Sequence, residues 1–267
     1  MNLTSPSQVK DWCISNGFHP NRTLGQNFLI DRNALEAIVD AAELQESSNI
    51  LEVGSGLGVL TEEMLKRGHK VTAIEKDKIL SARLAEALGN PENLTVHAGD
   101  ALDFIKEGVC DGFDTFISNL PYQAGTRILL DIVTRKEAKP ETIVVLVQTE
   151  VAERLAAGPG NKVRGLAGVW TQLDYDVKIV RVVKASCFWP RPQVGSSVVF
   201  MKRHHKNDEV ADDVRETFKA LTKRAFEHRR KQLGSTFKNI IESTARPEEL
   251  SNEDWLNLAT ALVGVDI

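Results

Sequence analysis

The chain has 267 residues, of which 42% are hydrophobic and 26% charged, and a formal net charge of −4, as is ordinary for a soluble globular protein with one large and one small domain. No apolar run approaches the roughly 18 residues of a membrane span, and the first twenty residues have no apolar core, so we expect a cytoplasmic protein without a membrane partner. Cys13, Cys110 and Cys187 lie far apart without C-x-x-C spacing, which argues against a metal site and a disulfide framework.

The N-terminal part predicts a short helix over residues 5–17 and an amphipathic helix over residues 32–42, with the stretch LGQNFL at 24–29 between them. In the second helix, apolar residues recur at three- and four-residue spacing. An apolar run over 49–53 then predicts the first strand of a sheet.

Three glycines at alternate positions, Gly54, Gly56 and Gly58, end this strand, and a helical pattern follows over 59–67. Glycines at such a turn let the backbone approach a ligand and adopt positive φ without a Cβ penalty. The dinucleotide spacing G-x-G-x-x-G would need glycine at position 59, where the chain has valine. The remaining pattern, E-x-G-x-G-x-G, resembles the first motif of S-adenosylmethionine-dependent methyltransferases.

Further along, strands and helices alternate. Strands are expected over 70–74, 94–97, 113–117 and 142–148, and helices over 78–88, 126–134 and 150–157. Continuous apolar strands that alternate with helices predict a parallel sheet covered on both faces. Two β-rich runs, 175–183 and 196–201, flank a proline-rich turn and predict an antiparallel edge. The fold class is therefore α/β and Rossmann-like.

From residue 202 onward the chain is helical and highly charged, so we expect a first domain over 1–201 and a small helical domain over 202–267. Residues 202–238 hold eleven Lys or Arg and six Asp or Glu. Such a local basic excess is either an electrostatic footprint for phosphates or a solvated helix face. The candidate RNA contacts are Lys223, Arg224, Arg229, Arg230 and Lys231.

Four consecutive strand ends supply Gly54, Glu75, Asp100 and Asn119. In an open parallel sheet, ligands bind beyond these ends. Glu75 follows the glycine loop by about 20 residues, where a carboxylate accepts hydrogen bonds from ribose hydroxyls. Asp100 is placed to accept from the amine of an adenine. Either acid alone is typical of a helix N-cap, but both beside a glycine loop favour an adenosine-containing cofactor.

The stretch Asn119-Leu120-Pro121-Tyr122 resembles the motif of methyltransferases that modify exocyclic amino nitrogens. An adenine N6 is a poor nucleophile because its lone pair is delocalised into the ring. The Asn119 side-chain oxygen and the Leu120 carbonyl would accept its two N–H bonds and aim the lone pair at a sulfonium methyl. Pro121 would hold the turn, and Tyr122 would offer a face for the base to stack on.

In their order, these segments resemble the ribosomal RNA adenine N6-dimethyltransferases. Further matching segments are QTEVAERL at 148–155, FWPRPQV at 188–194 and AFEHRRK at 225–231, so the resemblance covers nearly the whole chain. It implies a class I methyltransferase sheet with a small C-terminal helical domain that helps to grip RNA. It also implies S-adenosylmethionine as cofactor, S-adenosylhomocysteine as product, and no metal.

The resemblance implies a role for each matching residue. Gln26, Asn27 and Leu29 would close over the methionine end of the cofactor, Gly54 and Gly56 would line its loop, Glu75 would hold its ribose and Asp100 its adenine. Asn119 also borders the cofactor. Asn119, Leu120, Pro121 and Tyr122 would hold the target base, and Phe188 would pack against it from the other side.

Within the family, Leu120 resembles the bacterial branch that dimethylates two adjacent adenosines in the 3′-terminal hairpin loop of small-subunit (16S) rRNA during subunit maturation. The predicted partner is this rRNA within a 30S assembly intermediate, and the predicted state is a monomer. Three alternatives stay open: the large-subunit, macrolide-resistance type; a non-catalytic RNA- or ribosome-binding factor; and a small-molecule or protein methyltransferase. The segments 123–127 and 162–166 depart from the family pattern, with Arg164 in place of Tyr.

Overall fold

The computed structural model describes residues 1–136 and 138–265, which fall into two compact units. The first unit comprises Met1–Ala152 and Lys178–Lys202, and the second comprises Glu153–Val177 and Arg203–Ile267. The last boundary lies beside the expected one at 201/202. The segment Glu153–Val177, expected in the first domain, groups with the helical unit, and its Val169 and Leu173 are part of the core of that unit.

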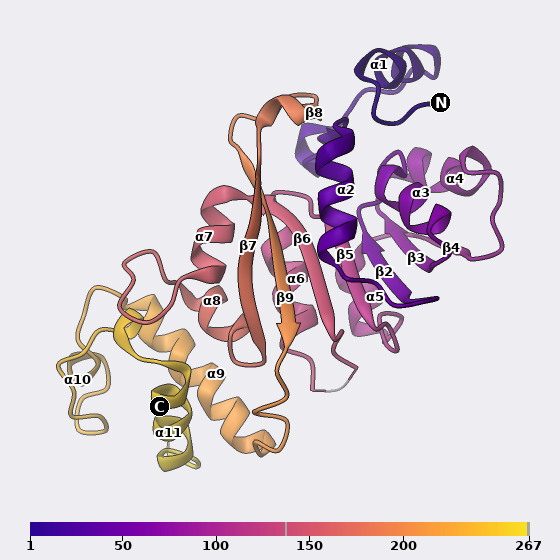
Figure 1. Cartoon of the computed structure of the whole chain (residues 1–267). Helices are drawn as coiled ribbons and strands as arrows, with labels where there is room; N and C mark the ends of the chain where they lie inside the picture. Colours follow the sequence, from indigo (N-terminus) through magenta and orange to yellow (C-terminus); the bar gives the residue numbers. More distant parts are fainter. Residues whose placement is uncertain (137, 266–267) are drawn as a thin grey trace. The chain divides into compact units, whose positions relative to one another are not determined.

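The first unit is built on a seven-stranded sheet in the described part of the chain, with strand order β4-β3-β2-β5-β6-β9-β7, read from right to left in Figure 1. The strands are β2 (Asn49–Val53), β3 (Lys70–Glu75), β4 (Leu94–Ala98), β5 (Thr115–Asn119), β6 (Thr142–Gln148), β7 (Tyr175–Val183) and β9 (Ser196–Arg203). Strands β4, β3, β2, β5 and β6 are parallel, and β9 runs antiparallel to β6. The predicted mostly parallel sheet with an antiparallel edge is confirmed.

The parallel strands alternate with helices, as expected. The helices of the first unit are α1 (Pro6–Ser15), α2 (Arg32–Ala41), α3 (Val59–Lys66), α4 (Lys78–Ala87), α5 (Ala101–Lys106) and α6 (Gly125–Val133), with short 3₁₀ turns at Arg22–Leu24 and Ala185–Cys187. Aspartate side chains accept backbone N–H groups at the starts of α2, α4 and α5, which satisfies donors that a helix N-terminus leaves unpaired. Two of these caps, Asp77 and Asp100, lie in the short turns that follow β3 and β4.

The core of the first unit lies where the central strands meet α2 and α3. Strands β5 and β6 are buried along almost their whole length, as continuous apolar strands covered on both faces should be. The main cluster includes Leu35, Ile38, Leu60, Ile117 and Val144, all 2% exposed or less. This packing fixes the carboxyl ends of β2 and β5 relative to one another.

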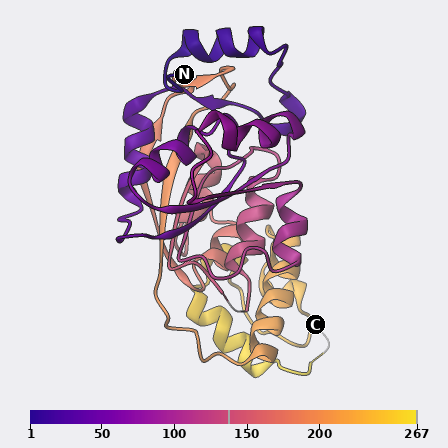
Figure 2. The same ribbon diagram turned by 90° about the vertical axis from the view of Figure 1, so that its right-hand side faces the viewer.

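A second, two-stranded sheet was not predicted. Strand β1 (Phe28–Leu29) pairs antiparallel with β8 (Phe188–Trp189). The rings of Phe28 and Trp189 stack with centroids 6.5 Å apart. Helix α1 packs on the same aromatic cluster through Val9 and Cys13, and both views show α1 beside the loop that carries β8 (Figures 1 and 2).

The second unit is helical. It contains the second half of α7 (Thr149–Ala156), then α8 (Leu166–Thr171), α9 (Asp212–Glu227), α10 (Leu233–Thr236), a 3₁₀ turn at Pro247–Glu249 and α11 (Asn252–Ala261). Its core surrounds Trp255 and Phe218, which are fully buried with Val169 and Leu233. Among the described residues of the whole chain, no helix has the length and apolarity to span a bilayer, and no cluster of three His, Cys, Asp or Glu side chains is arranged as a metal site.

Candidate active site

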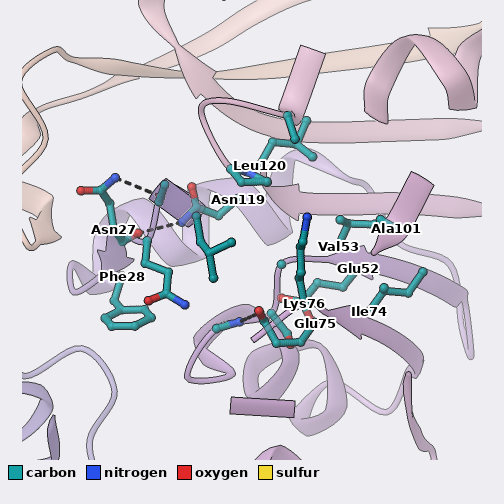
Figure 3. A pocket seen from close by; sticks show the side chains of 18 of the residues that line it. Asn27, Phe28, Glu52, Val53, Ile74, Glu75, Lys76, Ala101, Asn119 and Leu120 are labelled. Carbon is teal, nitrogen blue, oxygen red and sulfur yellow. Dashed lines mark hydrogen bonds between the residues drawn. The ribbon is translucent and has the colours of Figure 1, made fainter. Parts of the chain in front are cut away.

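A cavity of about 200 Å³ lies at the carboxyl ends of β2, β3 and β5 in the first unit (Figure 3). The strand order reverses between β2 and β5, and such a switch point is where open α/β sheets bind ligands. The structure brings nearly all predicted cofactor and base residues together in its wall: Gln26, Asn27, Leu29, Gly54, Gly56, Glu75, Asp100, Asn119, Leu120, Pro121 and Tyr122.

The glycine loop forms one wall because its backbone takes up left-handed conformations. Gly54 and Gly56 have φ of 74° and 59°, values that side chains with a Cβ rarely adopt. A Cβ on Gly56 would lie 3.3 Å from the ring of Phe28, and one on Gly54 would lie 3.6 Å from Pro121 Cδ. The loop therefore needs glycine both for its conformation and for close contact with neighbouring segments.

Glu75 ties the glycine loop to the end of β3. Its Oε2 accepts from the backbone N of Gly56 and its Oε1 from the backbone N of Asp77, both at 2.8 Å. The side chain is buried, and burial raises the pKa of its carboxyl while these two backbone bonds oppose the shift. A carboxylate has about four lone-pair sites, so capacity to accept from a ligand hydroxyl is left on both oxygens.

Asp100 combines two functions that the sequence left as alternatives. Its Oδ1 accepts from the backbone N of Leu102 as the cap of α5, and its Oδ2 accepts from Lys76 Nζ at 2.7 Å. It also lines the cavity. The hydrogen bond from Lys76 is the main reason why the pKa of Asp100 lies below its usual value, so this carboxyl is ionised and able to accept from an amine.

The turn after β5 is held by the segment that precedes β1. Asn119 Nδ2 donates to the backbone carbonyl of Asn27 at 3.2 Å, as the dashed line in Figure 3 shows. Gly25 packs directly on this turn, since a Cβ there would lie 3.1 Å from Tyr122 N. Because the Asn119 nitrogen is engaged, the hydrogen-bond network assigns the side-chain oxygen as the group left to accept from a ligand.

Gln26 and Asn27 are themselves fixed by hydrogen bonds. Gln26 Nε2 donates to Asp77 Oδ2 at 2.9 Å, and its Oε1 accepts from the backbone N of Asn21. Asn27 Nδ2 donates to the carbonyl of Gly25 at 3.1 Å. The segment over 24–29 is thus attached to the start of α4 on one side and to the turn after β5 on the other.

Phe188 is placed differently from the prediction. It is 2% exposed, belongs to the main core cluster and pairs with Leu29 across the β1–β8 sheet, and it is absent from the cavity wall. Side chains alternate between the two faces of a strand, so the pairing that turns Phe188 into the core leaves Trp189 on the side of Phe28. Its contact with a target base stays a prediction.

The predicted RNA contacts lie in the second unit and differ in exposure. Lys223, Arg224, Arg230 and Lys231 are exposed, and Arg224 also stands over the ring of Phe237. Arg229 is half-buried, donates to the carbonyl of Lys162 and lies 3.8 Å from Glu248. Part of its charge is therefore used inside the unit.

The sequence model of the family described as "Ribosomal RNA adenine dimethylase" matches residues 17–261, more than nine-tenths of the chain. The chain belongs to this family. As a ribosomal RNA adenine dimethylase it is an enzyme, and its methyl donor is S-adenosylmethionine.

Individual relatives of this adenine dimethylase agree with the family match. "Ribosomal RNA small subunit methyltransferase A" of Ligilactobacillus salivarius is 35% identical over 99% of the chain and 97% of the relative. The protein of the same name from Natranaerobius thermophilus is 34% identical over 94% and 88%. Among solved structures, a dimethyladenosine transferase from Plasmodium falciparum superposes with a TM-score of 0.74 at 22% identity, over 87% of this chain and 96% of the other. The 23S rRNA methyltransferase ErmE gives 0.66 at 23%, over 88% and 99%. These two similarities concern the fold alone.

Two further polar residues of this dimethylase line the cavity, and neither was predicted to have a role there. Glu52 is 1% exposed, accepts from Thr61 Oγ1 at 2.6 Å, and has a pKa raised to about 8, chiefly by burial. The Ser55 hydroxyl is buried and finds no hydrogen-bond partner among the described residues. Glu52 is the first residue of the E-x-G-x-G-x-G motif and Ser55 occupies one of its variable positions, and their burial in the cavity wall makes both of them polar groups available to a ligand.

The polar side chains that line the cavity fit S-adenosylmethionine. Glu52, Glu75 and Asp100 line it with carboxyl oxygens, and Lys76 is the single cation among its lining residues. A ligand that carries positive charge on sulfur and on an amino group would favour the ionised form of Glu52, whose pKa burial raises to about 8. The buried Ser55 hydroxyl supplies an unused polar atom at the glycine loop. A buried polar group without a partner costs free energy that a polar ligand recovers.

Proposed function

We propose that this enzyme methylates the N6 amino groups of two adjacent adenosines in the 3′-terminal hairpin loop of small-subunit (16S) rRNA, giving N6,N6-dimethyladenosines. Relatives over nearly the whole chain carry the name "Ribosomal RNA small subunit methyltransferase A", and this supports the choice of the small subunit over the large one. Leu120 in the target-base motif agrees with that choice. The target base must leave its stack to enter the cavity.

The observation that carries the proposal is the orientation of Asn119. Its nitrogen is bound to the carbonyl of Asn27, so its oxygen accepts one N–H of the target amine, and the Leu120 carbonyl accepts the other. These two acceptors draw the nitrogen toward tetrahedral geometry and direct its lone pair. When bound, S-adenosylmethionine supplies an electrophilic methyl group on a sulfonium sulfur. The nitrogen then loses its proton readily, so no titrating base is required.

The remaining cavity residues hold the cofactor and the base. In this proposal Glu75 accepts from ribose hydroxyls, Asp100 from the adenine amine, and Gly54 and Gly56 allow close approach of the loop. Gln26, Asn27 and Leu29 close over the methionine end, which agrees with the attachment of this segment to the start of α4 and to the turn after β5. Tyr122 stacks on the target base, which Pro121 positions by fixing the turn.

We propose that the helical unit binds rRNA through exposed cations at and just after the end of α9. The substrate would be the rRNA within a 30S assembly intermediate, and the enzyme would act as a monomer. Positive charge concentrated on one surface attracts phosphates even when the whole protein is acidic. Lys223, Arg224, Arg230 and Lys231 are the exposed candidates. Arg229 contributes to this surface while also holding the segment around Lys162.

Methylated adenosines should be mapped by mass spectrometry after incubation of the enzyme with unmethylated small subunits and, in parallel, large subunits. We expect two adjacent dimethyladenosines near the 3′ end of the small-subunit rRNA and none in the large subunit. Methylation of a large-subunit adenosine would favour the macrolide-resistance type. Absence of S-adenosylmethionine binding by calorimetry would instead support a non-catalytic binding factor.

A further inference from the structure

The hydroxyl group of Tyr122 is engaged by a residue outside the motif that contains it. Tyr122 Oη and Ser196 Oγ lie 2.7 Å apart, although the residues are 74 positions apart in the sequence. Tyr122 is half-buried and lines the cavity, whereas Ser196 is fully buried at the first position of β9. The bond therefore joins the wall of the cavity to the antiparallel edge of the sheet.

Ser196 is held rigidly by the backbone of the sheet. It pairs with Gln148 at the end of β6, and the antiparallel ladder continues without interruption to Lys202. The backbone N of Thr149 also donates to the carbonyl of Gly195, directly before Ser196. A hydroxyl fixed in this way is a defined anchor, because the serine side chain has only one torsion angle left.

Tyr122 has no comparable support from its own position in the chain. It lies in the turn between β5 and α6, outside any strand or helix. A tyrosine ring that serves as a stacking platform can swing about its first torsion unless its far end is bound. The bond to Ser196 is at that far end, so it restricts the direction in which the ring presents its face.

The chemistry of the pair indicates an anchor rather than a proton relay. Burial raises the pKa of Tyr122, and the bond with Ser196 offsets this only in part, so the phenol stays protonated at neutral pH. Both partners are neutral, and their hydrogen bond supplies geometry without moving charge.

We propose that Ser196 is a positioning residue for methyl transfer: its hydroxyl holds the ring of Tyr122 at the angle at which the target base stacks beside the Asn119 oxygen. This rests on the proposed role of Tyr122 as the stacking surface. Since small losses of alignment reduce the population of reactive geometries, the effect belongs mainly to kcat.

The first test observes the ring itself, without RNA. The chain has two tyrosines, Tyr122 and Tyr175, so labelling with 3-fluorotyrosine gives two ¹⁹F resonances, and Tyr122→Phe identifies one of them. We expect Ser196→Ala to shift the Tyr122 resonance. Ser197→Ala is the matched control, because Ser197 is equally buried on the same strand but bonds with Thr149, at 3.1 Å. An unchanged Tyr122 resonance in Ser196→Ala would overturn the proposal.

The second test measures turnover on unmethylated small subunits. Loss of one neutral hydrogen bond corresponds to a reduction in kcat of about tenfold, which we expect for Ser196→Ala and equally for Tyr122→Phe. The double variant should lose no more than either single one, since both remove the same bond. The affinity for S-adenosylmethionine and the KM for RNA should stay as in the parent, and Ser197→Ala should keep the parental kcat.

Parental kcat in Ser196→Ala, or losses that multiply in the double variant, would contradict the positioning role while leaving the proposed function intact. Failure of the parent enzyme, without any substitution, to methylate small subunits would instead contradict the proposed function. In that case the ¹⁹F spectra still decide whether Ser196 controls the Tyr122 ring.

Discussion

At the scale of single residues, the site depends on which atom of an amide faces the cavity. The Asn119 side chain has one donor end and one acceptor end, and the carbonyl of Asn27 takes the donor end. A carboxylate at the same position would offer two acceptors but no donor. The bond to Asn27 would then become a repulsion between two oxygens, so acceptor capacity and orientation can be separated by substitution.

We therefore predict that Asn119→Asp lowers kcat for rRNA methylation by about 10- to 100-fold, since misorienting one hydrogen-bonding group at a reacting atom costs about 1.4–2.7 kcal/mol. Asn119→Ala, which lacks the acceptor altogether, should lose at least as much. Single-turnover rates with saturating RNA and S-adenosylmethionine measure both. Parental rates in Asn119→Ala would eliminate the amide as the acceptor for the target amine.

Glu52 gives the protein a dependence of stability on pH. Its pKa is about 8 in the folded chain against a usual value of 4.5, so the folded state holds a proton that the unfolded state has released between these two values. Stability falls with pH wherever the folded state binds more protons. The cofactor-free protein should accordingly lose stability as the pH rises from about 4.5 to about 8, and lose no more from this group above that.

Glu52→Gln, which is neutral at every pH, should remove this loss. We expect the free energy of unfolding of the variant to exceed that of the parent by an amount that grows from pH 5 to pH 8, up to several kcal/mol. Urea denaturation of both proteins at intervals across this range measures the difference. A difference that stays constant with pH would show that Glu52 is already ionised in the folded chain.

At the scale of elements, the segment over 24–29 connects two parts of the chain that are distant in sequence: the turn after β5 and strand β8. The backbone at Gly25 lies against Pro121 and Tyr122, and the next residues continue into β1, which pairs with β8. The segment over 24–29 thus links the target-base turn to the small sheet. Its glycine is needed for two reasons: a φ of 68° and the absence of room for a Cβ.

Gly25→Ala should consequently affect activity as well as stability. Alanine at positive φ costs about 1–2 kcal/mol, and here the added Cβ, 3.1 Å from Tyr122 N, would also displace the turn that we propose holds the target base. We expect kcat to fall about tenfold or more, since small displacements at a reacting geometry have such effects. Gly17→Ala is the matched control, because Gly17 has a φ of 58° with nothing within 4 Å of an added Cβ. Equal activity losses in the two variants would contradict the specific contact.

The sequence predicted those elements that have a strong local signal. Apolar runs ended by Gly54, Glu75 and Asn119 were sufficient for the central strands, their parallel order and the location of the cavity. Two-residue strands such as β1 and β8 have no periodicity, so the burial of Phe188 depends on a pairing that only the folded chain shows. The same holds for the bond between Tyr122 and Ser196.

Arg164, which departs from the family pattern, is a buried structural residue of the second unit. In the sequence, this residue is the clearest departure of the segment over 162–166 from the family pattern. In the structure it is 1% exposed and donates to the Leu250 carbonyl and to Asn252 Oδ1. Burial lowers the pKa of its guanidinium, as expected for a cation removed from water. Its function is to hold the start of α11 in the second unit.

At the scale of the whole molecule, an acidic protein must bind an acidic polymer. The net charge of −4 opposes RNA at long range, so in the proposed function attraction depends on the local excess of cations in the second unit. Of the five candidate RNA contacts, Arg229 differs from the other four because it donates to the carbonyl of Lys162 within the unit. Substituting it would confuse a loss of charge with a loss of structure, so the charge is better tested at exposed positions.

Neutralising Lys223, Arg230 and Lys231 together to glutamine should weaken binding of small-subunit rRNA and flatten its dependence on salt. Each lost phosphate contact reduces the slope of log K against log salt by about 0.7–0.9, so three lost contacts reduce it by about 2 to 3. Lys10, Lys70 and Lys78 are exposed cations of the first unit, and their triple glutamine variant has the same net charge. Filter binding across a salt series compares the two. If both variants lose the same slope, the RNA responds to total charge, and the cations at the end of α9 are not its grip.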